Sequence, residues 1–251
     1  MANQFICSQP DFNRFLKAVT RGGIPDRVPF FEIHGQLDQK VLDYIKGQDP
    51  SFEWVCPIDS AFGEEDAELR RHISYMYALG YDYCTVIPSF EFKKSLRTSA
   101  STNRSFLMAE GAMIRDRGDF SRYLWPDASG DCYAQIESAK KYLPEGMKVV
   151  AYSRGPHLAS LYLLGYEGIC YLLEDDEKLV RDVINTAGER ILELYARCAR
   201  YDQVGALGIG DDLGFYNATY LSPETMRGLT GMGFPQPIGA KSIIKAPKRS
   251  I

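Results

Sequence analysis

The sequence has no closely spaced cysteine pair, no excess of basic residues and no long hydrophobic run. Its six cysteines stand at positions 7, 56, 84, 132, 170 and 198. No C-x-x-C or H-x-C pair is present, although such pairs commonly begin a zinc site. We therefore expect the cysteines to be reduced and buried, and we predict no cofactor.

Charge and hydropathy also limit the partners that we expect. The net charge is −4 and the isoelectric point is near 5.5, whereas proteins that bind nucleic acid or anionic membranes usually present a basic face. The chain lacks a run of about 20 apolar residues, and its start, MANQFICSQPDFNRF, lacks the regions of a signal peptide. These features predict a cytoplasmic protein that acts on a small molecule, with no nucleic-acid or membrane partner.

The apolar pattern predicts a fold of class α/β. With 251 residues, of which 45% are hydrophobic, the chain is large enough for one large domain or two small ones. Four continuously apolar segments, beginning near residues 28, 82, 148 and 204, are typical of buried strands. Helical patterns lie before and between them, over residues 12–19, 36–47, 64–80, 130–143 and most of 157–201. Both a doubly wound sheet and a (β/α)8 barrel fit, but no G-x-G-x-x-G follows the first strand, so dinucleotide binding has little support.

Polar side chains recur directly after the predicted strands, which favours the barrel. Barrel active sites are built from the C-terminal ends of the strands. The residues in such positions are Glu32, His34, Ser89, Glu91, Arg154, His157, Asp211 and Asp212. For the adjacent carboxylates, Asp211 and Asp212, two interpretations stay open: they face a ligand, or they form a polar turn that caps a strand. His34 is likewise either a site residue or a structural histidine.

Several segments resemble the uroporphyrinogen decarboxylase superfamily, which also contains corrinoid-linked methyltransferases. The resemblance runs from about residue 10 to 227 and is carried by PDRVPFFE, LWPD, LPEGMKVV, GPHLASLYLLGYEG and GDDLGFYNATYLSPE, in this order. It implies a TIM (β/α)8-type barrel whose cleft lies at the C-terminal ends of the strands. It also implies that this cleft accepts a tetrapyrrole, a corrinoid-bound methyl group or a related small molecule.

The resemblance assigns roles to individual residues. Tyr162, six positions after Pro156, matches the tyrosine that faces the substrate in the decarboxylases, although a helix aromatic also fits a core position. Asp211 and Asp212 match an Asp-Ser pair whose serine contacts a substrate carboxylate. Because an aspartate repels a carboxylate, Asp212 suggests a cationic, metal-bearing or hydroxylated ligand.

In other places the sequence departs from the family pattern. The two arginines that clamp substrate carboxylates in the decarboxylases correspond to His34 and Asp38, which cannot form a bidentate anion clamp. The aspartate that holds the pyrrole N–H groups is not evident in TVIPSFEF. The His-x-Cys pair and later Cys that bind zinc in the methyltransferases belong to the second half of the barrel.

The length of the chain predicts an incomplete barrel of about four of the eight strand-helix units. Residues 211–251 are too few for four more units, and after LSPETMR the composition becomes rich in Gly and Pro. We expect a partial barrel over residues 1–227 and a basic, disordered tail over 228–251, as in a truncated or frameshifted family member. Ser222 and Pro223 predict the start of a helix, and open sheet edges favour a homodimer.

The resulting functional prediction is decarboxylation of a tetrapyrrole, a step in porphyrin biosynthesis. The predicted catalytic residues are Asp211, Asp212 and Tyr162; the predicted substrate-binding residues are Glu32, His34, Ser89 and His157. One alternative is methyl transfer from a corrinoid or a methylated small molecule, for which the partner is a corrinoid protein. Another is an inactive half-barrel.

Overall fold

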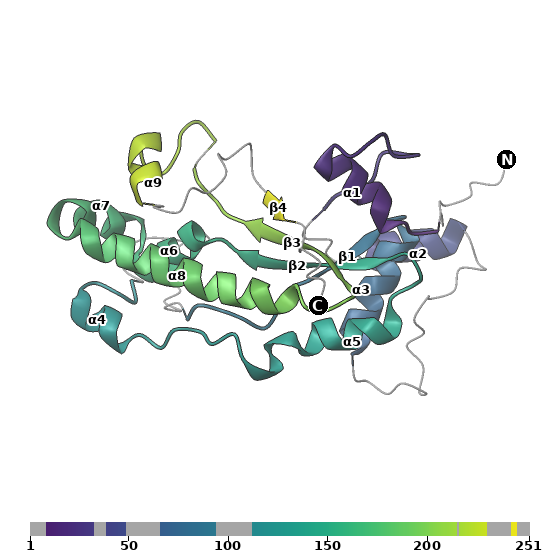
Figure 1. Cartoon of the computed structure of the whole chain (residues 1–251), viewed down its shortest axis with the longest axis horizontal. Helices are drawn as coiled ribbons and strands as arrows, with labels where there is room; N and C mark the ends of the chain where they lie inside the picture. Colours follow the sequence, from purple (N-terminus) through teal and green to yellow (C-terminus); the bar gives the residue numbers. More distant parts are fainter. Residues whose placement is uncertain are drawn as a thin grey trace.

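The computed structural model describes residues 9–32, 39–48, 66–93, 112–214, 216–229 and 242–244. In the described part of the chain, three parallel strands form the centre of the fold (Figure 1): β1 (Tyr83–Val86), β2 (Lys148–Arg154) and β3 (Val204–Gly210). A short strand, β4 (Ser242–Ile244), pairs antiparallel with β3, so the strand order is β1-β2-β3-β4. The α/β class is therefore confirmed. The (β/α)8 barrel stays a prediction, because the described strands form a four-stranded sheet.

The first of the four predicted strands is wrong over the residues that are described. Residues 28–32 have no regular secondary structure, and Ile33 lies outside the described residues. Instead of a ladder, the backbone of Glu32 contacts a side chain: its N–H donates to the Tyr83 hydroxyl (2.6 Å), which in turn lies 2.8 Å from its carbonyl oxygen. Phe30 and Phe31 pack their rings against Tyr81 and Phe15. Ring contacts thus hold this segment against the sheet.

Helices cover one side of the sheet. One of them carries the apolar stripe that is predicted within residues 157–201. In Figure 1, α3 (Ala67–Ala78), α5 (Ala134–Tyr142) and α8 (Glu177–Cys198) lie along one side of the strands. The stripe of α8 is buried over its whole length, as predicted: Leu179, Val183, Ala187, Ile191, Leu194 and Cys198. The C-terminal part of this stripe packs on the sheet, whereas Leu179 and Val183 pack against α6 (Pro156–Leu164). Both contacts hold α8 in place, because apolar area removed from water is the main favourable contribution to packing.

The long helical segment that begins at residue 156 is divided into three helices by two local breaks. Gly165, at φ 71°, ends α6 (Pro156–Leu164) before α7 (Tyr166–Asp175) begins. Asp176 then starts α8, because its side chain accepts the backbone N–H of Leu179 at 3.1 Å. The prediction of helix over most of this region is confirmed.

Helix α1 (Phe12–Thr20) contacts the beginnings of the strands. Asp11 caps it by accepting the N–H of Asn13 at 2.9 Å, and the N–H of Phe12 donates to the carbonyl of Gly146 at 3.0 Å, just before β2. The Phe12 ring lies so close to Gly205 in β3 that an added Cβ there would be 2.4 Å from it. A residue without a side chain is therefore required where α1 meets β3.

The remaining elements are short. They are α2 (Gln39–Gln48), α4 (Arg117–Arg122), the 3-10 helix η2 (Gly130–Tyr133) and α9 (Pro223–Leu229). Helix α9 begins as predicted, because the Ser222 hydroxyl accepts the N–H of Thr225 at 3.0 Å. Strand β4 corrects the predicted disorder of the tail for residues 242–244; the rest of the tail from residue 230 onward lies outside the described residues.

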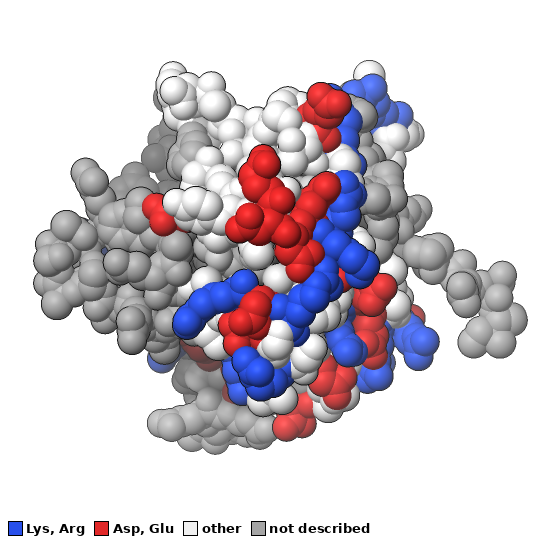
Figure 2. Space-filling view, turned by 90° about the vertical axis from the view of Figure 1, so that its left-hand side faces the viewer, with Lys and Arg blue, Asp and Glu red and all other residues white. Residues whose placement is uncertain are grey.

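Two surface properties concern the predicted partners. Within the described residues, no helix combines the length and apolar character needed to cross a bilayer. The end of the molecule that carries α4 and α7 shows acidic and basic side chains side by side (Figure 2). Ion pairs there join Arg117 to Asp176 and Asp182, and Arg181 to Glu177. Basic groups on this face are thus largely balanced by neighbouring carboxylates.

Candidate functional site

The residues that follow β2 and β3 meet at one edge of the sheet. The two strands are parallel, and Arg154, the last residue of β2, is paired in register with Gly210, the last residue of β3. The N–H of Gly155 donates to the carbonyl of Gly210 at 2.8 Å. The segments that begin at Gly155 and Asp211 therefore lie side by side, as parallel strands require. We call this region the strand-end site.

Asp211 joins the end of β3 to the start of α6. Its two carboxylate oxygens accept the backbone N–H groups of His157 (3.1 Å) and Leu158 (2.6 Å) in the first turn of the helix. Burial raises the pKa of this carboxyl to about 6, against the effect of the two N–H groups. Because both oxygens are engaged by the backbone, Asp211 matches the capping interpretation, and we assign it a positioning role.

Asp212 points away from the backbone contacts of its neighbour and is exposed. One carboxylate oxygen accepts the Tyr220 hydroxyl at 3.1 Å, and the other lies 3.4 Å from the backbone nitrogen of Gly214. The chain from Asp212 to Tyr220 thus folds back on itself, with a bridge between Gly214 and Thr219. Asp212 is therefore the carboxylate of the pair that is accessible to a ligand.

His157 is a buried histidine beneath this returning segment. The residue is 3% exposed, its Nδ1 lies 2.9 Å from the carbonyl oxygen of Asp212, and its ring stacks on Tyr220 with centroids 5.9 Å apart. Burial lowers the pKa of this imidazole, which favours the neutral form. The structure therefore places the His157 ring between α6 and the residues Asp212 and Tyr220. The substrate-binding role of His157 stays a prediction.

Arg154 and Tyr162 form the other part of the strand-end site. The guanidinium carbon of Arg154 lies 5.5 Å from the centroid of the Tyr162 ring, a cation–π geometry. Arg154 also makes a long contact of 3.9 Å with Glu91, and the side chains of both are exposed. Because exposed ion pairs of this length contribute little, the guanidinium remains available to an anion.

Electrostatic effects connect the two parts of this site. Burial raises the pKa of the Tyr220 phenol, and Asp212 and then Tyr162 add to this effect. Burial also raises the pKa of the Tyr152 phenol. Of the nearby groups, Arg154 lowers this pKa, whereas Asp211 and Tyr162 raise it. These phenols are therefore neutral hydroxyl groups at neutral pH, able to donate hydrogen bonds.

Other predicted site residues lie elsewhere or outside the description. The backbone N–H of Ser89 donates to the carbonyl of Cys132 at 3.1 Å, and its exposed side chain follows β1. Glu32 was predicted at the end of a strand, but no strand forms there; its carboxylate accepts the hydroxyl of Tyr81, just before β1 begins, at 3.2 Å. Glu32 is therefore placed near the start of β1, away from its end. His34 lies outside the described residues.

Cysteine placement agrees in part with the sequence-based prediction. Of the cysteines in the described ranges, Cys84, Cys132 and Cys198 are buried, whereas Cys170 in α7 is exposed. Burial raises the pKa of the Cys132 and Cys198 thiols, so both are protonated and unreactive at neutral pH.

One feature of the strand-end site was missed at the sequence level. Arg154 follows a predicted strand, but the sequence alone does not assign it to the site. The available signal was a charged residue that ends the apolar run KVVAYS directly before Gly155 and Pro156.

Comparison with family models, with curated proteins and with solved structures found no match for this chain.

Proposed function

We propose that this chain is a member of the uroporphyrinogen decarboxylase superfamily with a (β/α)8-type barrel, and that it decarboxylates a tetrapyrrole at the strand-end site. The observation that carries this proposal is the position of Arg154 over Tyr162, at the edge of the sheet where Asp212 is also exposed. The family clamp arginines are absent from their usual segment, and Arg154 supplies a guanidinium from β2 in their place.

Each residue has a defined part in the proposed reaction. Arg154 binds a substrate carboxylate through charge-assisted hydrogen bonds, while the Tyr162 ring contacts the pyrrole. Protonation of the pyrrole creates an electron sink, so the bond to the departing carboxylate breaks, CO2 leaves, and the electron pair enters the ring. A proton from solvent then converts the side chain to a methyl group, and the pyrrole releases the proton that it gained in the first step, so that one proton is taken up for each CO2 released. Asp212 stabilises the cationic intermediate, because its carboxylate has no cationic partner among the described residues.

The direct test is turnover of uroporphyrinogen by the full chain. We expect coproporphyrinogen to accumulate, measured by chromatography after oxidation to porphyrins. Arg154→Gln, Tyr162→Leu, which removes the aromatic ring, and Asp212→Ala should each lower the rate about tenfold or more. The matched control is Glu167→Gln, an exposed change on α7 outside the site, which should leave the rate unchanged. Turnover that survives all three site substitutions would show that this site is not where the reaction occurs.

Methyl transfer is the second candidate, favoured specifically by Asp212. An exposed carboxylate whose partners are a hydroxyl and a backbone N–H suits a cationic or hydroxylated ligand better than an anionic one. The test is incubation with methylcobalamin and a thiol, followed by the absorbance of the cobalt–methyl species. Loss of that species with formation of a thioether, in the absence of uroporphyrinogen turnover, would replace decarboxylation by methyl transfer. Absence of both reactions would support the inactive half-barrel.

A further inference from the structure

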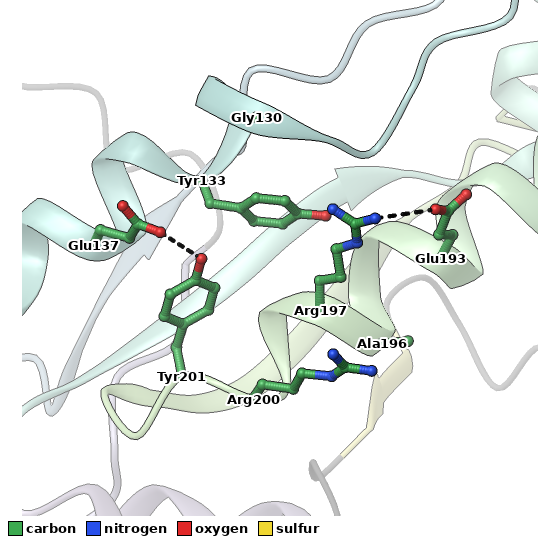
Figure 3. Close-up of a pocket in the computed structure, with 8 residues that line it drawn as sticks. All are labelled: Gly130, Tyr133, Glu137, Glu193, Ala196, Arg197, Arg200 and Tyr201. Atoms are coloured by element: carbon green, nitrogen blue, oxygen red, sulfur yellow. Dashed lines mark hydrogen bonds and ion pairs between the residues drawn. The ribbon is translucent and has the colours of Figure 1, made fainter.

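A cavity of about 620 Å³ lies in the helical layer and shares no residue with the strand-end site (Figure 3). It is bordered by η2, the first turn of α5, the last turns of α8 and the turn before β3. Its polar lining consists of two tyrosines, two glutamates and two arginines: Tyr133, Tyr201, Glu137, Glu193, Arg197 and Arg200. Its size falls within the range of about 300–1,000 Å³ that is typical of small-molecule sites.

Two tyrosines form an aromatic wall that is fixed in place. The ring centroids of Tyr133 and Tyr201 are 5.9 Å apart, with an angle of 35° between the ring planes. The buried Tyr133 donates its hydroxyl to the carbonyl of Ala128 at 2.9 Å, and Tyr201 donates to the Glu137 carboxylate at 2.6 Å. This bond, with burial, raises the pKa of Tyr201 to about 12. Both phenol rings are therefore neutral and held in a fixed orientation. A ligand ring that packs on them orders few side chains, which lowers the entropic cost of binding.

The lining of the cavity also carries two guanidinium groups, those of Arg197 and Arg200, beside the carboxylate of Glu193. The Tyr133 ring points toward the guanidinium of Arg197 (Figure 3), which makes only a loose contact of 3.6 Å with Glu193. The Glu193 carboxylate also lies 3.6 Å from the guanidinium of Arg190. The side chain of Arg200 is exposed, and no ion pair or hydrogen bond joins it to the described residues. Two guanidinium groups without a tight counter-ion suit a phosphate, which accepts paired N–H donors.

We propose that this cavity binds a small phosphomonoester with a planar ring, of the nucleoside monophosphate class. The ring packs on Tyr133 and Tyr201, and the phosphate contacts Arg197 and Arg200. The site is independent of the proposed reaction, because none of its residues belongs to the strand-end site. A purely structural role for the arginines gives a different expectation: cations in the last turn of a helix stabilise it through the macrodipole and require no ligand.

The test is isothermal titration calorimetry of the full chain with adenosine 5′-monophosphate. We expect saturable binding at one site, with adenosine and inorganic phosphate each weaker by about tenfold or more, because each retains only part of the contacts. Arg200→Gln and Tyr201→Ala should each weaken binding by about tenfold. Arg190→Gln is the matched control, since Arg190 also pairs with Glu193 but does not line the cavity.

Circular dichroism melting of each variant shows whether it is folded, and Arg200→Gln changes only an exposed side chain. Three results would overturn the proposal: no binding of the nucleotide at millimolar concentration, equal affinity in folded Arg200→Gln, or loss of binding in Arg154→Gln. The last result would place the nucleotide at the strand-end site. A stability loss in Arg197→Gln without nucleotide binding by the unchanged protein would support the purely structural role.

Discussion

The Oδ1 atom of Asp211 lies 2.6 Å from the backbone nitrogen of Leu158, so the end of β3 is joined to the first turn of α6 by a side-chain cap. The N–H groups of a first helical turn have no partner within the helix. Asp211→Ala should therefore lower the free energy of unfolding by about 1–2 kcal/mol, measured by urea denaturation. Asp212→Ala is the matched control, because its side chain is exposed, and it should change stability by less than about 0.5 kcal/mol. Equal losses in both variants would contradict the capping role.

The raised pKa of Asp211 predicts a pH dependence of stability. Burial raises it from 3.8 in the unfolded chain to about 6 in the fold, so between these values the folded protein holds a proton that the unfolded chain releases. The contribution of Asp211 is then fully present below pH 4 and is lost as the pH rises through 6. Relative to Asp211→Asn, which does not titrate, the free energy of unfolding should fall across this window. A flat difference between the two proteins from pH 4 to 7 would show that the carboxyl titrates normally.

A buried carboxylate also holds the N-terminal helix to the sheet. Asp82, at 1% side-chain exposure, pairs with Arg14 of α1 and lies 3.3 Å from Arg27. Asp82→Ala leaves the buried Arg14 without this partner and should cost about 3–5 kcal/mol in thermal or urea unfolding. Asp26→Ala breaks the other ion pair of Arg14, but Asp26 is 68% exposed, so a loss below about 1 kcal/mol is expected. The reverse order of the two losses would be inconsistent with this arrangement.

Gly210, at the end of β3, has no room for a side chain. An added Cβ would lie 1.4 Å from the hydroxyl oxygen of Tyr152 and 2.4 Å from its Cζ. Gly210→Ala should therefore destabilise the fold by about 1–3 kcal/mol, and a second substitution, Tyr152→Ala, should cost less in that background than alone. Gly168→Ala, in α7 with open space around it, is the control and should stabilise by up to about 1 kcal/mol. Strict additivity of the Gly210 and Tyr152 changes would mean that the two residues do not meet.

Three of the predicted strands begin within one residue of β1, β2 and β3, because each is a short apolar run between turns. The run VPFFEI has the same pattern but forms no strand over residues 28–32. Its aromatic rings contact Tyr81 and Phe15, although Phe30 and Phe31 stay 47% and 39% exposed. The apolar character of this run therefore reflects ring contacts and not strand pairing. Periodicity cannot separate these two outcomes, since only the position of a neighbouring strand decides between them.

The sequence predicts polar residues at the strand ends, but it does not determine which contacts each of their side chains makes. Adjacent carboxylates, Asp211 and Asp212, are equivalent in the sequence, and the placement of α6 decides which one meets its N–H groups. Arg154 joins Tyr162 only because β2 and α6 are consecutive and the chain turns sharply at Gly155. Such contacts depend on side-chain direction after a turn, which sequence spacing does not determine.

Strand β4 gives β3 a hydrogen-bonded neighbour on the side opposite β2, through the pairs of Leu207, Gly208 and Ile209 with residues 242–244. A further parallel strand, as a barrel would require, needs the same backbone groups. The two arrangements are therefore mutually exclusive, and the sheet grows past β3 only when β4 is released. The edge of β3 is thus closed to a further strand by a ladder of three residue pairs.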